Sequence, residues 1–140
     1  MIRRVAREMV LQSLFQMDFT QADPEESLKI ALEVQRDEEK SEEAEKAFGY
    51  AEKVLKGVSE NLSEIDGLIG KYAINWEVKR MPGIDRNILR MAIYEMRFAK
   101  EKLPVTVAVN EAVELAKTFG TEKSSRFING VLGKLMREEK

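Results

Sequence analysis

The chain has 140 residues, a net charge of −2 at neutral pH, and neither cysteine nor histidine. This length corresponds to a single domain, residues 1–140, and the lack of cysteine excludes a disulfide framework. No apolar run approaches the roughly 18–20 residues that a membrane span requires, and the first residues lack the continuous apolar segment of a signal peptide. We therefore expect a cytoplasmic protein without membrane contact.

Helical periodicity governs the start of the chain. Residues 4–18 predict a first helix with a broad apolar side that faces a core. The residues on that side are Val5, Met9, Val10, Leu11, Leu14, Phe15 and Met17. A second helix is predicted after it, with Asp23 as the N-cap and Pro24 at the first helical position.

Two further helices are predicted before the middle of the chain. After an acidic connector, Ser41 is placed to cap a third helix, which ends or bends near Asn61. The segment "LSEIDGLIGKYAINW" then has the spacing of a fourth helix. Its Ser63 and Asp66 resemble a capping box, in which the first side chain caps the helix.

The segment "KRMPGID" is the clearest interruption of the helical pattern, because it contains adjacent proline and glycine. We take it as the boundary between two helical halves, about 1–80 and 81–140. Asp85 is predicted to cap the next helix, over "RNILRMAIYEMRFAKEK".

Two helices are expected to complete the chain. Pro104 separates the preceding helix from "VTVAVNEAVELAKTFG", whose first residues also have strand propensity but whose apolar spacing favours a helix that ends at Gly120. Thr121 or Ser124 is predicted to cap the last one. The predicted fold is therefore all-α, a compact bundle of about seven helices arranged as two packed helical halves.

The composition argues against catalysis. Without histidine or cysteine the chain lacks the commonest general base, the commonest zinc ligands and any thiol nucleophile. No glycine-rich phosphate loop is present. Carboxylate pairs such as Glu111 and Glu114 lie on the polar flank of an amphipathic helix. We expect a binding module that is not an enzyme and has no cofactor or metal.

The first 17 residues carry three arginines and one acid, although the chain is acidic overall. On a helix, Arg3 and Arg7 fall on the apolar side, in line with Val10, whereas Arg4 begins the polar strip. We expect all three to overhang the end of the bundle, where a planar guanidinium suits phosphate. The alternative is the solvated end of a core helix.

A second basic strip is predicted on the helix that follows Asp85. Arg86, Arg90 and Arg97 fall within about 40° of one another, with Tyr94 beside them. The alternative is that these arginines pair with nearby acids such as Glu95 or Asp85.

The last loop, "GTEKSSRF", combines basic and aromatic residues. Lys123 and Arg126 lie in it, Lys117 precedes it, and Phe119 and Phe127 flank it. Single-stranded RNA favours this combination, because cations bind phosphates while flat rings stack on unpaired bases. The alternative is that both phenylalanines belong to the core.

Four segments together resemble the family of the bacterial transcription antitermination factor NusB. They are "RRVAREMVLQSLFQMDF", "DRNILRMAIYEM", "PVTVAVNEAVELAKTFG" and "SSRFINGVLGK", in the family's order and spacing. The resemblance implies an all-helical fold without catalysis that binds boxA RNA of nascent ribosomal RNA jointly with NusE, a small-subunit ribosomal protein. It also implies that such a complex assembles on RNA polymerase.

The resemblance also suggests which residues bind. The RNA-binding residues are expected to be Arg3, Arg4, Arg7, Phe15, Lys117, Lys123 and Arg126. NusE is expected to contact Asp85 and Arg86 at the start of their helix, with Arg90 and Tyr94 further along the same strip.

Two other functions compete with this hypothesis. A similar helical RNA-binding domain accompanies a methyltransferase domain in some ribosomal-RNA cytosine methyltransferases, but a chain ending at Lys140 is expected to lack room for a cofactor-binding domain. The other is a structural homodimer whose arginines contact only its own acids. Because some family members self-associate, the sequence leaves the oligomeric state open.

Overall fold

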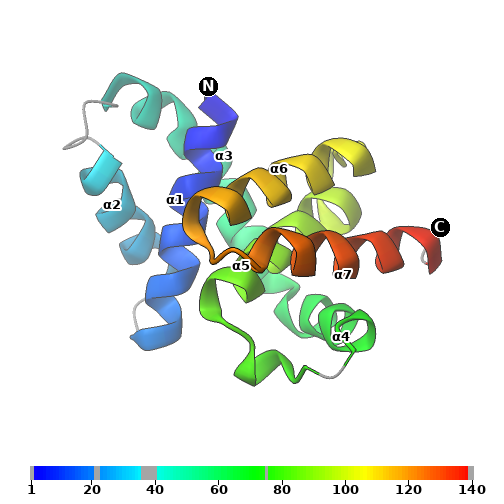
Figure 1. Ribbon diagram of the computed structural model, residues 1–140. Coiled ribbons are helices and arrows are strands. Elements are labelled where there is room, and N and C mark those ends of the chain that lie inside the picture. Colours follow the sequence, from blue (N-terminus) through cyan, green and yellow to red (C-terminus); the bar gives the residue numbers. More distant parts are fainter. Residues whose placement is uncertain (1, 21–22, 36–40, 75, 139–140) are drawn as a thin grey trace.

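The computed structural model describes residues 2–20, 23–35, 41–74 and 76–138. Within these ranges the structure contains seven α-helices and no strand, which confirms the all-α prediction (Figure 1). The helices are α1 (Ile2–Phe19), α2 (Pro24–Gln35), α3 (Ser41–Glu60), α4 (Leu62–Tyr72), α5 (Gly83–Ile93), α6 (Val105–Phe119) and α7 (Ser124–Glu138). A 3-10 turn, η2 (Val78–Arg80), precedes α5, and a π-helical turn, η3 (Tyr94–Phe98), follows it. In the described part, no helix has the length and apolarity to cross a membrane.

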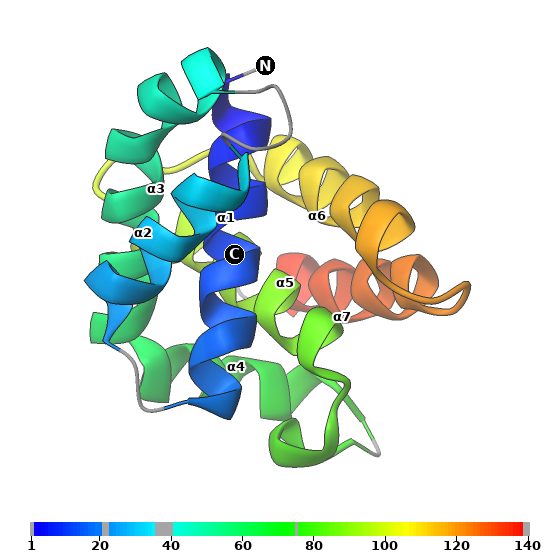
Figure 2. The same cartoon turned by 90° about the vertical axis from the view of Figure 1, so that its left-hand side faces the viewer.

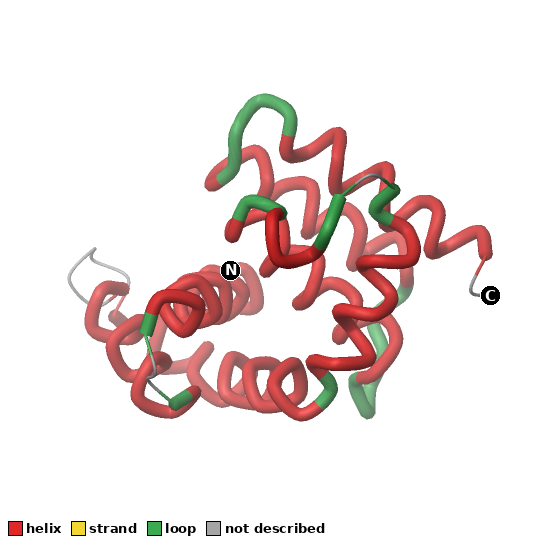
Figure 3. The backbone as a smooth tube through the Cα atoms, turned by 90° about the horizontal axis from the view of Figure 1, so that it is seen from below, coloured by secondary structure: helices red, strands yellow, loops and turns green. Residues whose placement is uncertain are grey.

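The helices form two groups with α5 between them. Helix α1 packs against α2, α3 and α5, while α6 and α7 pack on each other and on α5 (Figures 1 and 2). Helix α4 contacts α5 and α7. The view from below shows that helices make up most of the described chain, with loops between them (Figure 3). Helix α5 is consequently the element through which the start and the end of the chain meet.

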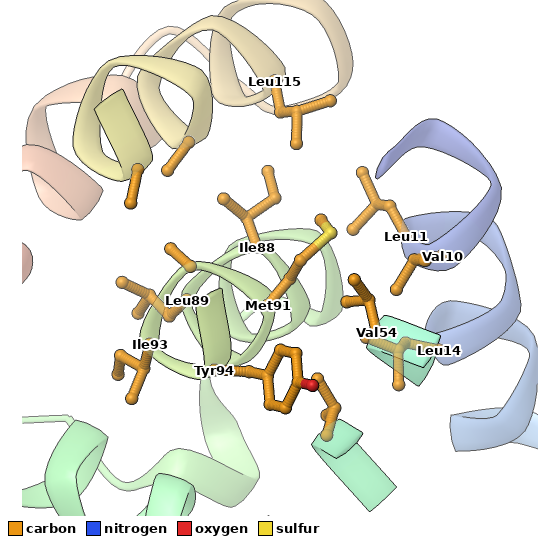
Figure 4. Packing of buried hydrophobic residues seen from close by; sticks show 14 of the residues in the cluster. Val10, Leu11, Leu14, Val54, Ile88, Leu89, Met91, Ile93, Tyr94 and Leu115 are labelled. Carbon is orange, nitrogen blue, oxygen red and sulfur yellow. The ribbon is translucent and has the colours of Figure 1, made fainter. Parts of the chain in front are cut away.

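One apolar cluster contains residues from all seven helices. Its centre lies around Met91 of α5, which faces Leu11 of α1, Val54 of α3 and Leu115 of α6 (Figure 4). The apolar side predicted for α1 is confirmed, since its aliphatic residues from Val5 onward are buried or partly buried. Burial of such side chains, at about 25 cal/mol for each Å² removed from water, is the main force that holds the bundle together.

The predicted start of α2 is confirmed, because Asp23 Oδ1 accepts the Glu26 backbone N–H at 2.9 Å. The predicted cap at Ser63 is wrong. Helix α4 begins at Leu62, with Asn61 in the cap position, so Ser63 lies inside the first turn. The predicted cap of α3 by the Ser41 side chain and the connector 36–40 lie outside the described residues.

Asp85 does not cap α5. That helix begins two residues earlier, at Gly83 after Pro82, so the Asp85 side chain lies within the first helical turn and is buried. Proline fixes an extended backbone at the cap position and lets the helix begin directly behind it. The sequence pattern therefore placed the boundary correctly but chose the wrong first residue.

The helix after Asp85 ends at Phe98, earlier than predicted, in a π-helical turn. In η3 the Ala99 backbone N–H donates to the Tyr94 carbonyl at 2.9 Å, five residues back, and the chain leaves the helix there. The next residues fold back on this turn, because the Leu103 N–H donates to the Glu95 carbonyl at 2.9 Å. Such π turns often accompany functional sites.

The two boundaries of α6 agree with the sequence. Pro104 occupies the position before its first residue and Gly120 the position after its last, and the "VTVAV" segment is helical. At the start of α7, the Thr121 hydroxyl accepts the Lys123 N–H at 3.3 Å and the Ser124 hydroxyl accepts the Thr121 N–H at 2.9 Å. These bonds order the loop before α7, which begins at Ser124, and among the described residues neither hydroxyl accepts an N–H from the first turn as the predicted N-cap would.

Candidate nucleic-acid interface

Arg7 is a buried residue at the N-terminal end of α1, with 4% of its surface exposed. Its guanidinium forms a bidentate ion pair with Glu95, at 2.9 Å from Nε to Oε1 and 3.0 Å from Nη2 to Oε2. Nη1 lies 3.3 Å from Glu111 Oε1. The expectation that Arg7 overhangs the bundle is wrong, because carboxylates from η3 and α6 hold it inside.

Tyr50 of α3 completes this buried cluster by donating its hydroxyl to Glu95 Oε2. Burial and the bond to Glu95 raise the pKa of Tyr50, so the phenol stays protonated. For Arg7, burial opposes the charged form but the bonds to Glu95 outweigh it, and the pKa of the guanidinium is raised. Arg7, Glu95 and Tyr50 thus form a fixed polar cluster beneath the end of α1.

Arg3 and Arg4 lie above this cluster and are exposed. The Arg3 guanidinium lies over the Tyr50 ring, 4.7 Å from its centroid, which is a cation–π contact. Arg4 Nη2 lies 3.1 Å from Glu111 Oε2, and this hydrogen bond raises the pKa of Arg4. The Arg4 side chain remains 45% exposed. These two arginines can therefore reach a phosphate group outside the bundle.

A pocket of about 430 Å³ lies between the start of α5 and the α6–α7 loop. Apolar, basic and acidic side chains share its lining, which consists of Trp76, Pro82, Asp85, Thr121, Lys123, Arg126 and Phe127. Trp76 packs edge-to-face on Phe127, with ring centroids 6.0 Å apart. The pocket therefore joins two cations to two aromatic rings, the combination predicted for this loop.

Sequence reasoning missed Trp76 as a member of this site. It is 47% exposed although it is the one tryptophan of the chain, and it lies six residues before Pro82. A large aromatic residue beside the main break in helical pattern was the signal available. The alternative that Phe119 and Phe127 are both core residues is wrong, since Phe119 is exposed and Phe127 is partly buried.

The remaining RNA candidates, Lys117 and Phe15, are not among the residues that line this pocket. Lys117 is exposed near the end of α6 and lies 3.9 Å from Glu114. Phe15 is partly buried and packs edge-to-face on the exposed Phe19, with centroids 5.0 Å apart. A Cβ at Gly83 would lie 3.1 Å from the Phe15 ring, so α1 and α5 approach closely here.

The arginines of α5 do not form the exposed basic strip predicted for them. Arg86 Nη2 lies 2.8 Å from Asp18 Oδ2 of α1, and Arg90 forms a bidentate pair with Asp66 of α4 at 2.8 and 2.9 Å. Pairing with acids was the alternative, but these acids come from other helices. The predicted partners were Glu95 and Asp85.

Tyr94 also differs from the prediction, because its ring lies in the core rather than beside an exposed strip (Figure 4). It packs against α3, where any Cβ at Gly57 would overlap the ring. Asp85 lines the pocket with Lys123 and Arg126. The four predicted partner-binding residues therefore do not share one surface, and only Asp85 opens toward the α6–α7 loop.

Comparison with known proteins identifies the family. The model of the NusB family matches residues 4–137. The chain belongs to the NusB family. This is a non-catalytic family, in agreement with the prediction that the chain is not an enzyme. The resemblance predicted from the four sequence segments is thereby confirmed.

Relatives and solved structures cover nearly the whole chain. The transcription antitermination protein NusB of Symbiobacterium thermophilum is 47% identical over 98% of this chain and 90% of its own length. The structure of NusB from T. maritima superposes with a TM-score of 0.82 at 40% identity, covering 97% of this chain and 91% of the other. A structure of antitermination factors NusB and NusE in complex with dsRNA superposes with a TM-score of 0.79 at 27% identity, covering 97% and 96%.

Proposed function

We propose that this NusB-family chain is a cytoplasmic transcription antitermination factor that binds boxA RNA of nascent ribosomal RNA jointly with NusE. Family membership and the described complex of related NusB and NusE with RNA support the assignment. The observation that carries it is the pair of exposed guanidiniums, Arg3 and Arg4, held at the end of α1. The resulting complex acts on RNA polymerase during synthesis of the RNA.

The RNA face in this proposal has two parts. Arg3 and Arg4 contact phosphates at one end of α1, while Lys117, Lys123 and Arg126 do so around the α6–α7 loop. Trp76 and Phe127 provide rings on which an unpaired base stacks. Arg7 is a positioning residue in this scheme, because its guanidinium is already bonded to Glu95. Phe15 supports the exposed ring of Phe19.

NusE contacts the surface at Asp85 and Arg86 in this proposal. Asp85 opens into the pocket beside the α6–α7 loop, and Arg86 is held by Asp18. This arrangement brings NusE next to the proposed RNA face, so that one RNA can touch both proteins. Arg90 and Tyr94 act indirectly, through the shape of α5.

The chain acts as one unit of two helical halves in this proposal, because α1 packs directly on α5. A denaturant titration followed by far-ultraviolet circular dichroism and by Trp76 fluorescence tests this. The two probes should give coincident transitions. Transitions with different midpoints would contradict a single unit.

The deciding experiment measures fluorescence anisotropy of labelled boxA RNA with this chain, with and without NusE, and light scattering of the same mixtures. We expect a 1:1:1 complex whose affinity falls with salt. Asp85→Asn should weaken the gain in affinity that NusE provides. A homodimer that persists with RNA and NusE present, with no RNA in the particle, would favour the structural-homodimer alternative.

A further inference from the structure

A second pocket lies beside the N-terminal end of α1, away from the α6–α7 loop. It has a volume of about 150 Å³ and lies between α3 and the loop that follows η3. In Figure 2 this loop is the yellow connection that passes behind α3 and α1 toward α6. No part of the function described above uses this pocket except Arg3, which forms one of its walls.

Three cations from three separate elements line this pocket. They are Arg3 of α1, Lys53 of α3 and Lys102 of the loop after η3, and the pocket contains one carboxylate, Glu101. Among the described residues, none of these cations forms an ion pair with a carboxylate. The pocket therefore has a local charge excess of about two, on a chain whose net charge is −2.

The fold fixes the walls of this pocket. The hydroxyl of Tyr50 bonds to Glu95, which holds the ring on which Arg3 stacks. Tyr94 forms another wall, and its ring can approach α3 because Gly57 has no side chain. The bond from the Leu103 N–H to the Glu95 carbonyl ties the loop that carries Lys102 to η3. The cations therefore project from supports that are already ordered.

We propose that this pocket binds one phosphate group of the RNA strand, so that the RNA continues past Arg3 onto α3. The inference rests on the proposed function. A volume of about 150 Å³ is large enough to admit a phosphate group. Two ammonium groups and a guanidinium supply donors for its oxygens. Continuity with Arg3 favours an RNA phosphate over a free anion.

The test compares two double variants of the full chain with the same change in net charge. Lys53→Gln with Lys102→Gln removes the two pocket lysines. Lys56→Gln with Lys100→Gln removes exposed lysines from the same two segments that do not line this pocket. Anisotropy is measured across a salt series with labelled boxA RNA in two lengths, a minimal element and one extended by several nucleotides at both ends, with NusE present.

We expect the wild-type chain to bind the extended RNA more tightly than the minimal one. The pocket variant should lose this gain, roughly three- to tenfold, and its salt dependence with the extended RNA should fall by about 0.7 in slope, the value of one phosphate contact on a single strand. The control variant should keep both. Unfolding curves of the two variants check that both remain folded.

Several results would overturn the inference. One is that the two variants bind the extended RNA with the same affinity and the same salt slope. Another is that the pocket variant loses affinity for inorganic phosphate while its affinity for RNA is unchanged. Self-association of the wild type that only the pocket variant abolishes, with RNA binding unchanged, would assign the pocket to a homodimer instead. A wild-type chain that binds neither length of RNA would refute the proposed function itself. This result is distinguishable from a failure of the pocket proposal alone, because it is seen without any variant.

Discussion

The arginines of α1 and those of α5 have similar spacing in the sequence but different surroundings in the structure. On α5, Arg86 and Arg90 are both held by carboxylates of other helices and are mostly buried. On α1, Arg7 is held in the same way, but Arg3 and Arg4 project above it. Pairing with a carboxylate does not by itself decide whether an arginine is available to RNA, because Arg4 also pairs with Glu111 yet its side chain stays 45% exposed. Burial decides it, since the side chain of Arg7 is only 5% exposed.

The largest expected effect concerns the buried side of α1. Replacing Arg7 by Met leaves the Glu95 carboxylate buried without its cation, which should lower the free energy of unfolding by about 3–5 kcal/mol. Urea titrations measure the loss. The double variant with Glu95→Leu removes both charges and should regain much of it. A single variant within about 1 kcal/mol of wild type would show that this ion pair is not needed for folding.

The next effect concerns the paired arginines of α5. Arg90→Met removes the bidentate bonds to Asp66 and should cost about 1.5–3 kcal/mol of unfolding free energy, while RNA affinity stays unchanged. The matched control is Arg80→Met, which removes an exposed pair with Glu77 at 3.8 Å and should change stability little. A loss of RNA affinity in folded Arg90→Met would show that Arg90 also contributes to RNA binding.

A smaller effect is expected at the exposed side of α1. Arg4→Gln should weaken RNA binding a few fold and lower the salt slope by about 0.7, because one phosphate contact is lost. The unfolding transition should not move. Arg137→Gln, which changes an exposed arginine at the far end of α7, is the control. Identical salt slopes for the two variants would remove Arg4 from the RNA face.

The smallest effect tests the acid that borders this site. Glu111 accepts bonds from both Arg4 and Arg7, so it competes with an RNA phosphate for Arg4. Glu111→Gln should raise RNA affinity about two- to threefold, since Arg7 keeps its bonds to Glu95. Anisotropy at low salt measures the change, with Glu52→Gln as a control for net charge. Weaker binding would mean that Glu111 positions Arg4 rather than competing for it.

Local pattern in the sequence was sufficient for much of the fold. The apolar spacing of α1, the break at Pro82 and the boundaries of α6 all appear in the structure where the pattern placed them. Asp23 was recognised as a cap because capping uses residues three apart. The errors at Ser63 and Asp85 also have a local origin, since neighbouring residues can start a helix equally well and packing selects one.

The site was predicted less completely than the fold, for a different reason. The α6–α7 loop was identified because its cations and rings are neighbours in sequence, and Lys123, Arg126 and Phe127 do line one pocket. Trp76 was missed because it reaches that pocket from a distant segment. Tyr94 was assigned to a surface although its ring is buried. Its burial depends on the missing side chain of Gly57 in α3, and the residue pattern around Tyr94 does not reveal that contact.

The sequence by itself determined the helical class, the apolar side of the first helix and the family. These depend on residue type and on spacings of a few residues, which helical geometry converts directly into faces. Only the tertiary structure decided which arginines are available. The carboxylates that hold Arg7, Arg86 and Arg90 lie 88, 68 and 24 residues away along the chain. Ion pairing depends on distance in space, so folding alone separates the arginines that stabilise the bundle from those that can meet RNA.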